Sequence, residues 1–169
     1  MLESMSETGP SISDADIAQL ERLIRAPLPK SYRQFLAKYN GGKPTPDCFP
    51  ILNYTAISFG GINYFFRLRS KIKSSNIDWN YEIFRNRVPD GYLPIAGDGS
   101  GNILFMALSS CRTSNEGVIV FWDHESEHSP PTSRNMYSVA LSFDDLLSQL
   151  HRRDIKAEIA KARARRHLE

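Results

Sequence analysis

Three apolar runs separated by polar connections stand out in the centre of the chain. Residues 93–96 lead through residues 97–102 into residues 103–108, and a third run covers residues 117–122. Between the first two runs, Gly, Asp, Ser and Asn supply the positive φ angles and local hydrogen bonds of a tight reversal. The pattern predicts an antiparallel meander whose middle is covered on both faces, or on one face and part of the other. Its first turn is predicted at Gly97, Gly99, Gly101 and Asn102.

Two amphipathic helices are predicted near the N-terminus. Ser13 followed by Asp16 is a near match to a capping box, and apolar residues recur after it at helical spacing. Pro27 and Pro29 stop this helix, and Pro29 suits the first position of a second helix that carries an aromatic-rich stripe. The second helix is predicted to end where the backbone readily becomes left-handed, at Asn40, Gly41 and Gly42.

The remaining segments have less regular patterns. Residues 43–50 contain three prolines and are predicted to form a loop, whereas residues 51–54 and 56–59 suggest one broken strand or two short ones. Residues 62–83 are assigned to a helix, and residues 126–134 to a flexible surface loop. A strand over residues 136–140 precedes a final helix, which is expected to begin after Ser142 and to run through Ile155 and Ile159.

Composition places the chain among ordinary globular proteins. With 169 residues, 41% hydrophobic and 24% charged, it is long enough to bury one core, and we predict a single domain. The predicted fold class is α+β, a mostly antiparallel sheet with an N-terminal helix pair, a middle helical segment and a C-terminal helix packed on it. Residues 1–12 are expected to be flexible, residues 13–160 to form the domain, and residues 161–169 to form a basic tail whose last residues resemble a cloning remnant.

The distribution of charge and the search for membrane and signal segments indicate where the protein is expected to be located and which partners are not expected. Residues 151–169 hold seven basic and three acidic residues, whereas the preceding residues hold 14 basic and 16 acidic ones. The basic tail is interpreted as a solvated helix end, so no direct nucleic-acid partner is expected. Because no apolar run reaches the roughly 18 residues of a membrane span and no signal segment is present, we expect a cytoplasmic protein without a membrane partner. Cys48 and Cys111 have no spacing typical of a disulfide or zinc site.

Two motifs suggest metal binding only superficially. Residues 98–102 match the opening of a calcium loop, but Ile103 and Ser109 occupy the positions that require Gly and a bidentate Glu. His124 and His128 have helical spacing, yet they follow a strand and precede two prolines. We therefore expect no metal and no cofactor.

No pattern of an enzyme active site is present, so surface recognition becomes the main hypothesis. The chain lacks a nucleophile elbow, a phosphate-binding loop and a dinucleotide fingerprint. An aromatic side chain at the end of the third strand, with acids around it and near the hairpin turn, would suit a basic protein partner. The alternative, a core tryptophan beside solvated acids, stays open. The candidate partner-binding residues are Asp98, Trp122, Asp123, His124 and Glu125.

Several of these segments together resemble the SUKH superfamily. Residues 28–36 followed by Asn40, Gly41 and Gly42 are similar to its second-helix signature, and residues 93–102 to its central hairpin. Residues 117–125 and 139–147 resemble the following strand and the entry to the last helix. The resemblance covers most of residues 13–150 and implies an α+β fold of helices packed on a mostly antiparallel sheet.

The resemblance also implies a function. Bacterial members bind and neutralise a toxin, commonly a nuclease or deaminase domain, and are not enzymes. The implied partner is therefore a cognate toxin, which we expect to be basic, and the chain is expected to be a monomer or weak dimer. An intracellular regulatory scaffold, as in the yeast members, is the alternative, and a metal-dependent hydrolase is a third hypothesis.

Overall fold

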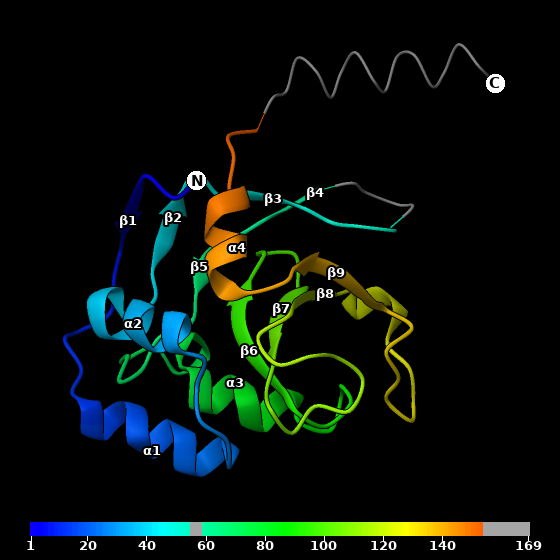
Figure 1. The fold of residues 1–169 in the computed structure, drawn as a ribbon, viewed down its shortest axis with the longest axis horizontal. Helices are drawn as coiled ribbons and strands as arrows, with labels where there is room; N and C mark the ends of the chain where they lie inside the picture. Colours follow the sequence, from blue (N-terminus) through cyan, green and yellow to red (C-terminus); the bar gives the residue numbers. More distant parts are fainter. Residues whose placement is uncertain (55–58, 154–169) are drawn as a thin grey trace.

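A five-stranded antiparallel sheet forms the centre of the protein (Figure 1). The computed structural model describes residues 1–54 and 59–153. The strands lie in the order of the sequence, and each pairs with the next. They are β5 (Tyr64–Phe65), β6 (Tyr92–Gly97), β7 (Ile103–Ala107), β8 (Ile119–Trp122) and β9 (Met136–Ala140).

The predicted meander is confirmed, and of the two coverages that the sequence left open the structure shows both faces covered. Gly97 pairs with Ile103 across the turn between β6 and β7, and every residue of β6, β7 and β8 is buried. Helix α3 (Ile77–Phe84) covers one face, where Phe84 meets the aromatic residues of β7 and β8. Phe49 approaches Phe121 from the other face. The near-continuous apolar runs therefore reflect a sheet enclosed between two layers.

The N-terminal helix pair also follows the prediction. Helix α1 (Asp14–Ile24) begins with the capping box: the Ser13 amide donates to the Asp16 carboxylate at 2.8 Å, and the Asp16 amide donates to the Ser13 hydroxyl. Helix α2 (Lys30–Tyr39) follows Pro29 and buries its aromatic stripe. Phe35 packs edge-to-face on Phe65 of β5 and on Phe143, at centroid distances of 5.0 and 4.9 Å. This stripe is therefore part of the core.

Residues Asn40, Gly41 and Gly42 end α2 in the predicted left-handed backbone. Their φ angles are 48°, 75° and 115°. A Cβ on Gly41 would lie 2.5 Å from the Phe66 carbonyl oxygen, so only glycine allows this approach to the strand region. The turn therefore fixes the end of α2 against the chain around β5.

The predicted helix over residues 62–83 is only partly right. Its first part is strand β5, followed by a 3-10 turn, η1 (Lys73–Ser75), and the helix proper is α3. The Phe66 amide donates to the Ile95 carbonyl, and the Asn63 amide to the Gly97 carbonyl, both at 2.9 Å. Pairing with β6 satisfies these backbone groups and overrides the local helical pattern.

Residues 43–50 and the N-terminus are more ordered than predicted. The segment expected to be a loop contains β2 (Lys43–Thr45) and β3 (Cys48–Pro50), while residues 51–54 form no strand. The N-terminal segment, predicted to be flexible, contains β1 (Ser4–Ser6), which pairs with β2. Backbone pairing across the two segments is the reason for both corrections. Strand β4 (Phe59–Gly61) pairs with β3, and residues 55–58 of the predicted second strand lie outside the described residues.

The last helix is shorter than predicted. Helix α4 (Phe143–Gln149) begins at Ser142, whose hydroxyl accepts from the Asp145 amide at 3.1 Å, as expected. It ends because His151 leaves the helix to exchange two backbone hydrogen bonds with Cys48. Ile155 and Ile159, predicted to continue the helix, and the basic tail lie outside the described residues. Within the described ranges, no helix is long and apolar enough to cross a membrane.

Candidate functional site

The predicted hairpin turn is organised by the side chain of Asp98. One carboxylate oxygen accepts from the amides of Ser100 and Asn102 at 2.7 and 3.1 Å, and the other from the Asn102 side-chain amide at 2.7 Å. Gly99 and Gly101 have φ angles of 82° and 107°. Both carboxylate oxygens thus serve the turn itself, as expected for an Asp at a tight reversal.

The meander brings this turn against the end of β8, as the sequence analysis anticipated. The side-chain oxygen of Asn102, Oδ1, accepts from the backbone amide of His124 at 3.1 Å and lies 2.8 Å from Nδ1 of the same residue. Because an amide oxygen only accepts, this contact requires Nδ1 to carry the proton. The imidazole ring lies so close to Gly101 that a Cβ there would be 3.0 Å from Nε2. Asp98, Asn102 and His124 therefore form one rigid polar unit, which we call the hairpin end.

Trp122 belongs to the core and is not an exposed anchor. Its side chain is 1% exposed and packs edge-to-face against Phe84 and Phe105, with centroids 5.6 and 6.2 Å apart. On β8 it points to the face covered by α3, which is why the strand buries it. Of the two readings left open by the sequence, the core tryptophan is the one that the structure shows.

Asp123 is also turned inward and does not form part of an acidic rim. It is 6% exposed, and its carboxylate accepts from the Glu125 amide, the Ser126 hydroxyl and the Tyr54 hydroxyl at 2.9 to 3.0 Å. These bonds fix the start of the 3-10 turn η2 (His124–Ser126). Of the predicted rim acids, Glu125 is exposed and Asp98 is partly exposed.

Tyr54 provides a test of this buried arrangement. Desolvation by the surrounding protein, followed by the hydrogen bond to Asp123, raises the pKa of Tyr54 to about 12 from a usual value of 10.0. The folded state thus holds the phenol proton more tightly than the unfolded chain, so this contribution to stability is complete below about pH 10 and lost as the pH rises through about 12.

The measurement is the difference in phenolate absorbance between the wild type and Tyr54→Phe, with circular dichroism recorded to follow folding. We expect the difference to titrate near pH 12. A difference that titrates at the ordinary tyrosine value would contradict the contact with Asp123.

Arg87 covers the aromatic cluster around Trp122 on its outer side. Its guanidinium makes two hydrogen bonds to Glu127, at 2.9 and 2.7 Å, and lies over the rings of Phe84 and Trp122 at 5.0 and 5.1 Å. The hydrogen bond from Arg87 lowers the pKa of Glu127. The negative charge of Glu127 is therefore compensated by the positive charge of Arg87. The Arg87 side chain also shields Trp122 from solvent.

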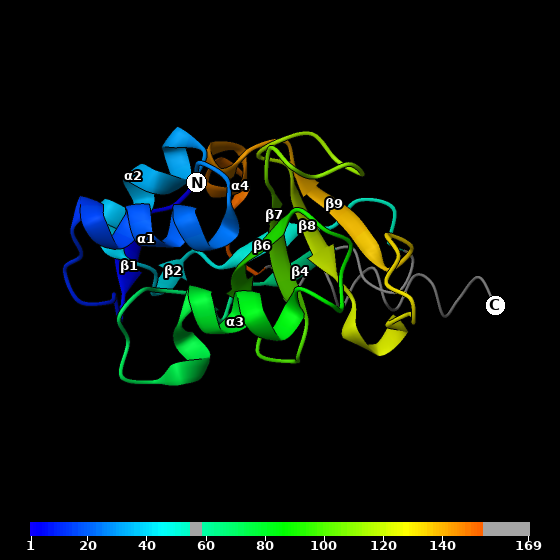
Figure 2. The same cartoon turned by 90° about the horizontal axis from the view of Figure 1, so that it is seen from below.

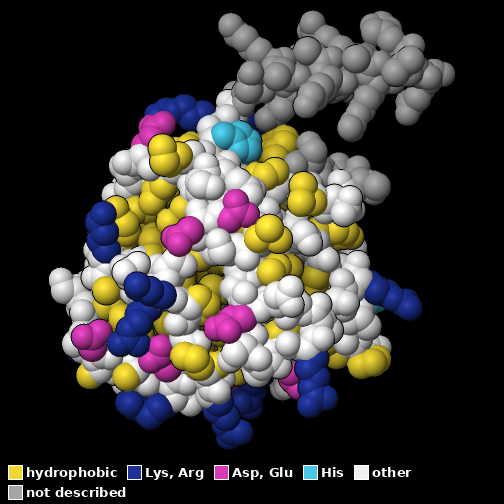
Figure 3. Space-filling view, viewed as in Figure 1, with side chains coloured by type: hydrophobic (Ala, Val, Ile, Leu, Met, Phe, Trp, Pro, Cys, Tyr) yellow, Lys and Arg dark blue, Asp and Glu magenta, His cyan; other side chains and the backbone are white. Residues whose placement is uncertain are grey.

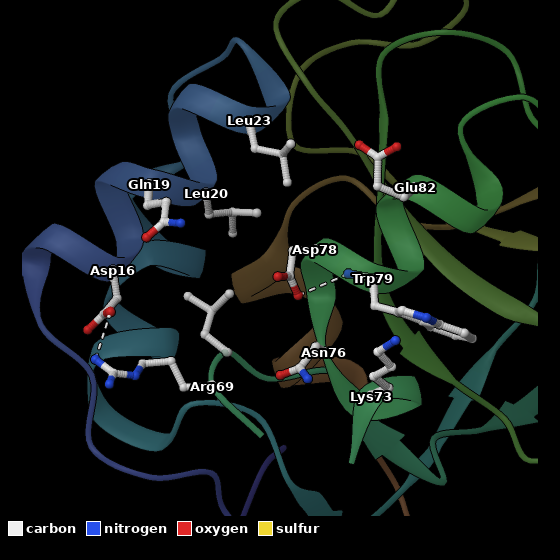
Figure 4. Close-up of a pocket in the computed structure, with 11 residues that line it drawn as sticks. Asp16, Gln19, Leu20, Leu23, Arg69, Lys73, Asn76, Asp78, Trp79 and Glu82 are labelled. Atoms are coloured by element: carbon white, nitrogen blue, oxygen red, sulfur yellow. Dashed lines mark hydrogen bonds and ion pairs between the residues drawn. The ribbon is translucent and has the colours of Figure 1, made fainter. Parts of the chain in front are cut away.

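A groove between α1 and α3 was not predicted from the sequence (Figure 4). It has a volume of about 550 Å³, a floor of buried Leu20 and Leu68, and two partly exposed side chains, Leu23 from α1 and Trp79 from α3. Figure 2 shows the two helices near each other at the same end of the molecule. We call this surface the α1–α3 groove.

Charges of both signs surround the α1–α3 groove. Asp16 and Arg69 form an ion pair of 3.1 Å at one end, and Lys73, Asp78 and Glu82 line the side of η1 and α3. Two hydrogen bonds from Ser13, and then Arg69, lower the pKa of Asp16, so it stays ionised in the pair. In Figure 3, acidic, basic and apolar side chains alternate along the lower edge, where Figure 1 places α1 and α3. A mixed surface of this kind suits recognition of a protein.

The comparisons with known proteins agree with this fold. The sequence model of the SMI1 / KNR4 family (SUKH-1) matches residues 11–149. The chain belongs to this family. It is also 27% identical over 165 residues to the SPbeta prophage-derived uncharacterized protein YokK of Bacillus subtilis (strain 168), and the match covers 88% of this chain and 80% of YokK. The SMI1 / KNR4 family includes toxin immunity proteins, and its members are typically immunity or regulatory proteins rather than enzymes.

Within residues 1–54 and 59–153, no group of three or more His, Cys, Asp or Glu side chains is placed to hold a metal ion. His124 is engaged with Asn102, and Asp98 with its own turn. The hairpin end thus has a structural role in the described chain.

Proposed function

We propose that this protein is an immunity protein that neutralises a cognate toxin by binding to it. The supporting observation is the α1–α3 groove, where Trp79 and Leu23 remain 36% and 39% exposed on an otherwise folded domain. Partly exposed aromatic side chains in concave surfaces are frequent anchors of protein interfaces. Membership of the SMI1 / KNR4 family, which includes toxin immunity proteins, adds the class of partner.

The proposed mode of action is steric and requires no chemistry by this chain. The core fixes α1 and α3 relative to the sheet: Ile17, Leu20 and Ile24 are buried on α1, and Ile77 and Phe84 on α3. A preformed surface loses little conformational entropy on association, so more of the contact energy appears as affinity. The partner is a toxin domain of the nuclease or deaminase type, and the complex forms in the cytoplasm.

The hairpin end is a second candidate contact. Glu125 is exposed beside His124 and Asp98, and acids at an interface rim accelerate association with a basic partner. Because Trp122 and Asp123 are buried, neither side chain is available there to anchor a partner. It is expected to contribute to the rate of association more than to the lifetime of the complex.

The test is co-expression with a toxin domain of the nuclease or deaminase type, for which the genes that neighbour this one are searched first. We expect the wild-type chain to restore growth of cells that produce the toxin, because a bound toxin cannot reach its substrate. Purified protein should inhibit the toxin at one-to-one stoichiometry, as measured by the toxin's own activity. Unchanged toxicity, with the chain shown to be folded and abundant in the same cells, would disprove the proposal.

A further inference from the structure

The α1–α3 groove combines an apolar floor with a wall that stays exposed. Leu20 and Leu68 are 2% and 6% exposed at the floor, while Leu23 and Trp79 are 39% and 36% exposed on opposite sides. Figure 4 shows Leu20 and Leu23 on α1 and Trp79 on α3. An occupant that covers these two side chains removes apolar surface from water and is stabilised by the hydrophobic effect.

The exposure of the residues that line the groove favours a macromolecule as its occupant. A small-molecule site usually encloses most of its ligand. Here seven of the 11 lining residues are exposed. Two further exposed apolar residues are sequence neighbours of lining residues: Ile83 follows Glu82 and is 44% exposed, and Ile72 precedes Lys73 and is 63% exposed. An aromatic side chain within a larger surface of mixed polarity is typical of protein interfaces.

The charges on the α3 side indicate which partner fits. Asp16 and Arg69 pair with each other, so neither charge is free to select a ligand. Asp78 and Glu82 are exposed, line the groove and lie one helical turn apart. Within the described residues, Glu82 forms an ion pair with the exposed Arg85, at 3.1 Å, and solvent weakens such a pair. Lys73 lines the same side of the groove, so two carboxylates face one cation there and the net charge beside Trp79 is negative.

Resting on the proposed function, we infer that the groove binds a segment of the toxin with one large apolar side chain and a Lys or Arg beside it. The apolar side chain lies between Leu23 and Trp79, over the floor of the groove. The cation faces Asp78 and Glu82. Insertion of the apolar side chain controls the lifetime of the complex, and the charge contact controls the rate at which it forms.

Truncation of the two exposed apolar side chains tests the anchor. We expect Trp79→Ala and Leu23→Ala each to raise the Kd for the purified, catalytically inactive toxin domain at least tenfold, mainly through a faster off-rate. Leu141→Ala is the matched control, because Leu141 is 79% exposed and does not line the groove. It should change the Kd less than twofold. Surface plasmon resonance gives the rates, and thermal melts confirm that each variant is folded.

Removal of the negative charges of Asp78 and Glu82 tests the proposed contact with a Lys or Arg of the toxin. The double variant Asp78→Asn with Glu82→Gln should lower the on-rate severalfold at low salt and have little effect at high salt. Lys73→Gln, which removes a cation from the same groove, should leave the on-rate unchanged or increase it. The opposite pattern would mean an acidic segment and would overturn the inference.

The remaining outcomes separate this inference from the proposed function. If the wild type does not bind the toxin, both are wrong. If the wild type binds but Trp79→Ala and Leu23→Ala bind equally well, the proposed function stands and the inference is wrong; a loss of binding by Glu125→Lys would then place the contact at the hairpin end. If Trp79→Ala converts a wild-type dimer into a monomer without affecting the toxin, the occupant is a second copy of this chain.

Discussion

Replacement of Trp122 by Ala is expected to lower the free energy of unfolding by about 3 to 5 kcal/mol. The side chain is 1% exposed and fills the space between α3 and the sheet, edge-to-face with Phe84 and Phe105. Arg87 lies over its ring at 5.1 Å and loses this contact as well. Because a close-packed interior relaxes only partly, the variant keeps a cavity in addition to the lost burial.

Urea denaturation measures this loss, with Trp79→Ala as the matched control. Trp79 is the other tryptophan of the chain and is 36% exposed on α3, so its truncation should cost less than half as much. Both variants should keep the wild-type dependence of unfolding free energy on denaturant, which indicates an unchanged cooperative unit. Equal losses for the two variants would show that Trp122 does not have the central packing role assigned to it.

Trp122 illustrates what the apolar pattern of the sequence could and could not establish. The run over residues 117–122 predicted a strand with both faces covered, and β8 has this form. A fully buried strand has no polar alternation to mark which side chain faces solvent. The exposure of its last residue depends on α3 and Arg87, which approach from elsewhere in the chain. The sequence therefore left the core and surface readings of Trp122 open.

Segments whose partners lie far away in the chain were the least predictable. Strand β1 exists because it pairs with β2, and β5 because it pairs with β6. Each has only two or three residues, too few for a period of two to be visible. By contrast, the capping box of α1 and the hairpin turn at Asp98 are made by neighbouring residues, and both were predicted.

The α1–α3 groove was missed for a related reason. It joins Leu23 and Trp79, which come from separate helices, and the helix carrying Trp79 lies in the stretch of ambiguous periodicity. The buried residues of α3, Ile77, Asn80 and Phe84, do follow helical spacing. With that face assigned to the core, Trp79 and Ile83 fall outside it, which is the signal that could have identified an exposed apolar surface.

Asn40 connects three segments of the domain with one buried side chain. Its amide nitrogen donates to the carbonyls of Pro10 and Leu68, both at 2.8 Å, and its amide oxygen accepts from the Leu68 amide at 2.7 Å. The residue is 2% exposed and has a φ angle of 48°, in the left-handed region. Asn is one of the few non-glycine residues that adopts this conformation readily, and here it also satisfies buried backbone groups.

Asn40→Ala is therefore expected to lower the free energy of unfolding by about 2 to 4 kcal/mol. The Leu68 amide loses its buried acceptor, which costs about 1 to 3 kcal/mol, and Ala in the left-handed conformation adds about 1 kcal/mol. Asn40→Gly removes the same hydrogen bonds but adopts the backbone angle without strain, so it should lose about 1 kcal/mol less than Asn40→Ala. Urea denaturation of the three proteins gives both differences.

The two substitutions separate the hydrogen bonds of Asn40 from its backbone conformation. Equal losses in Asn40→Ala and Asn40→Gly would show that the left-handed angle contributes nothing, whereas a wild-type stability for Asn40→Gly would show that the contacts with Pro10 and Leu68 do not stabilise the fold. Hydrogen exchange adds a local measure, because the Leu68 amide donates to Asn40 alone among the hydrogen bonds of the described residues. Its protection should fall in both variants, since each removes the acceptor that keeps this amide from water.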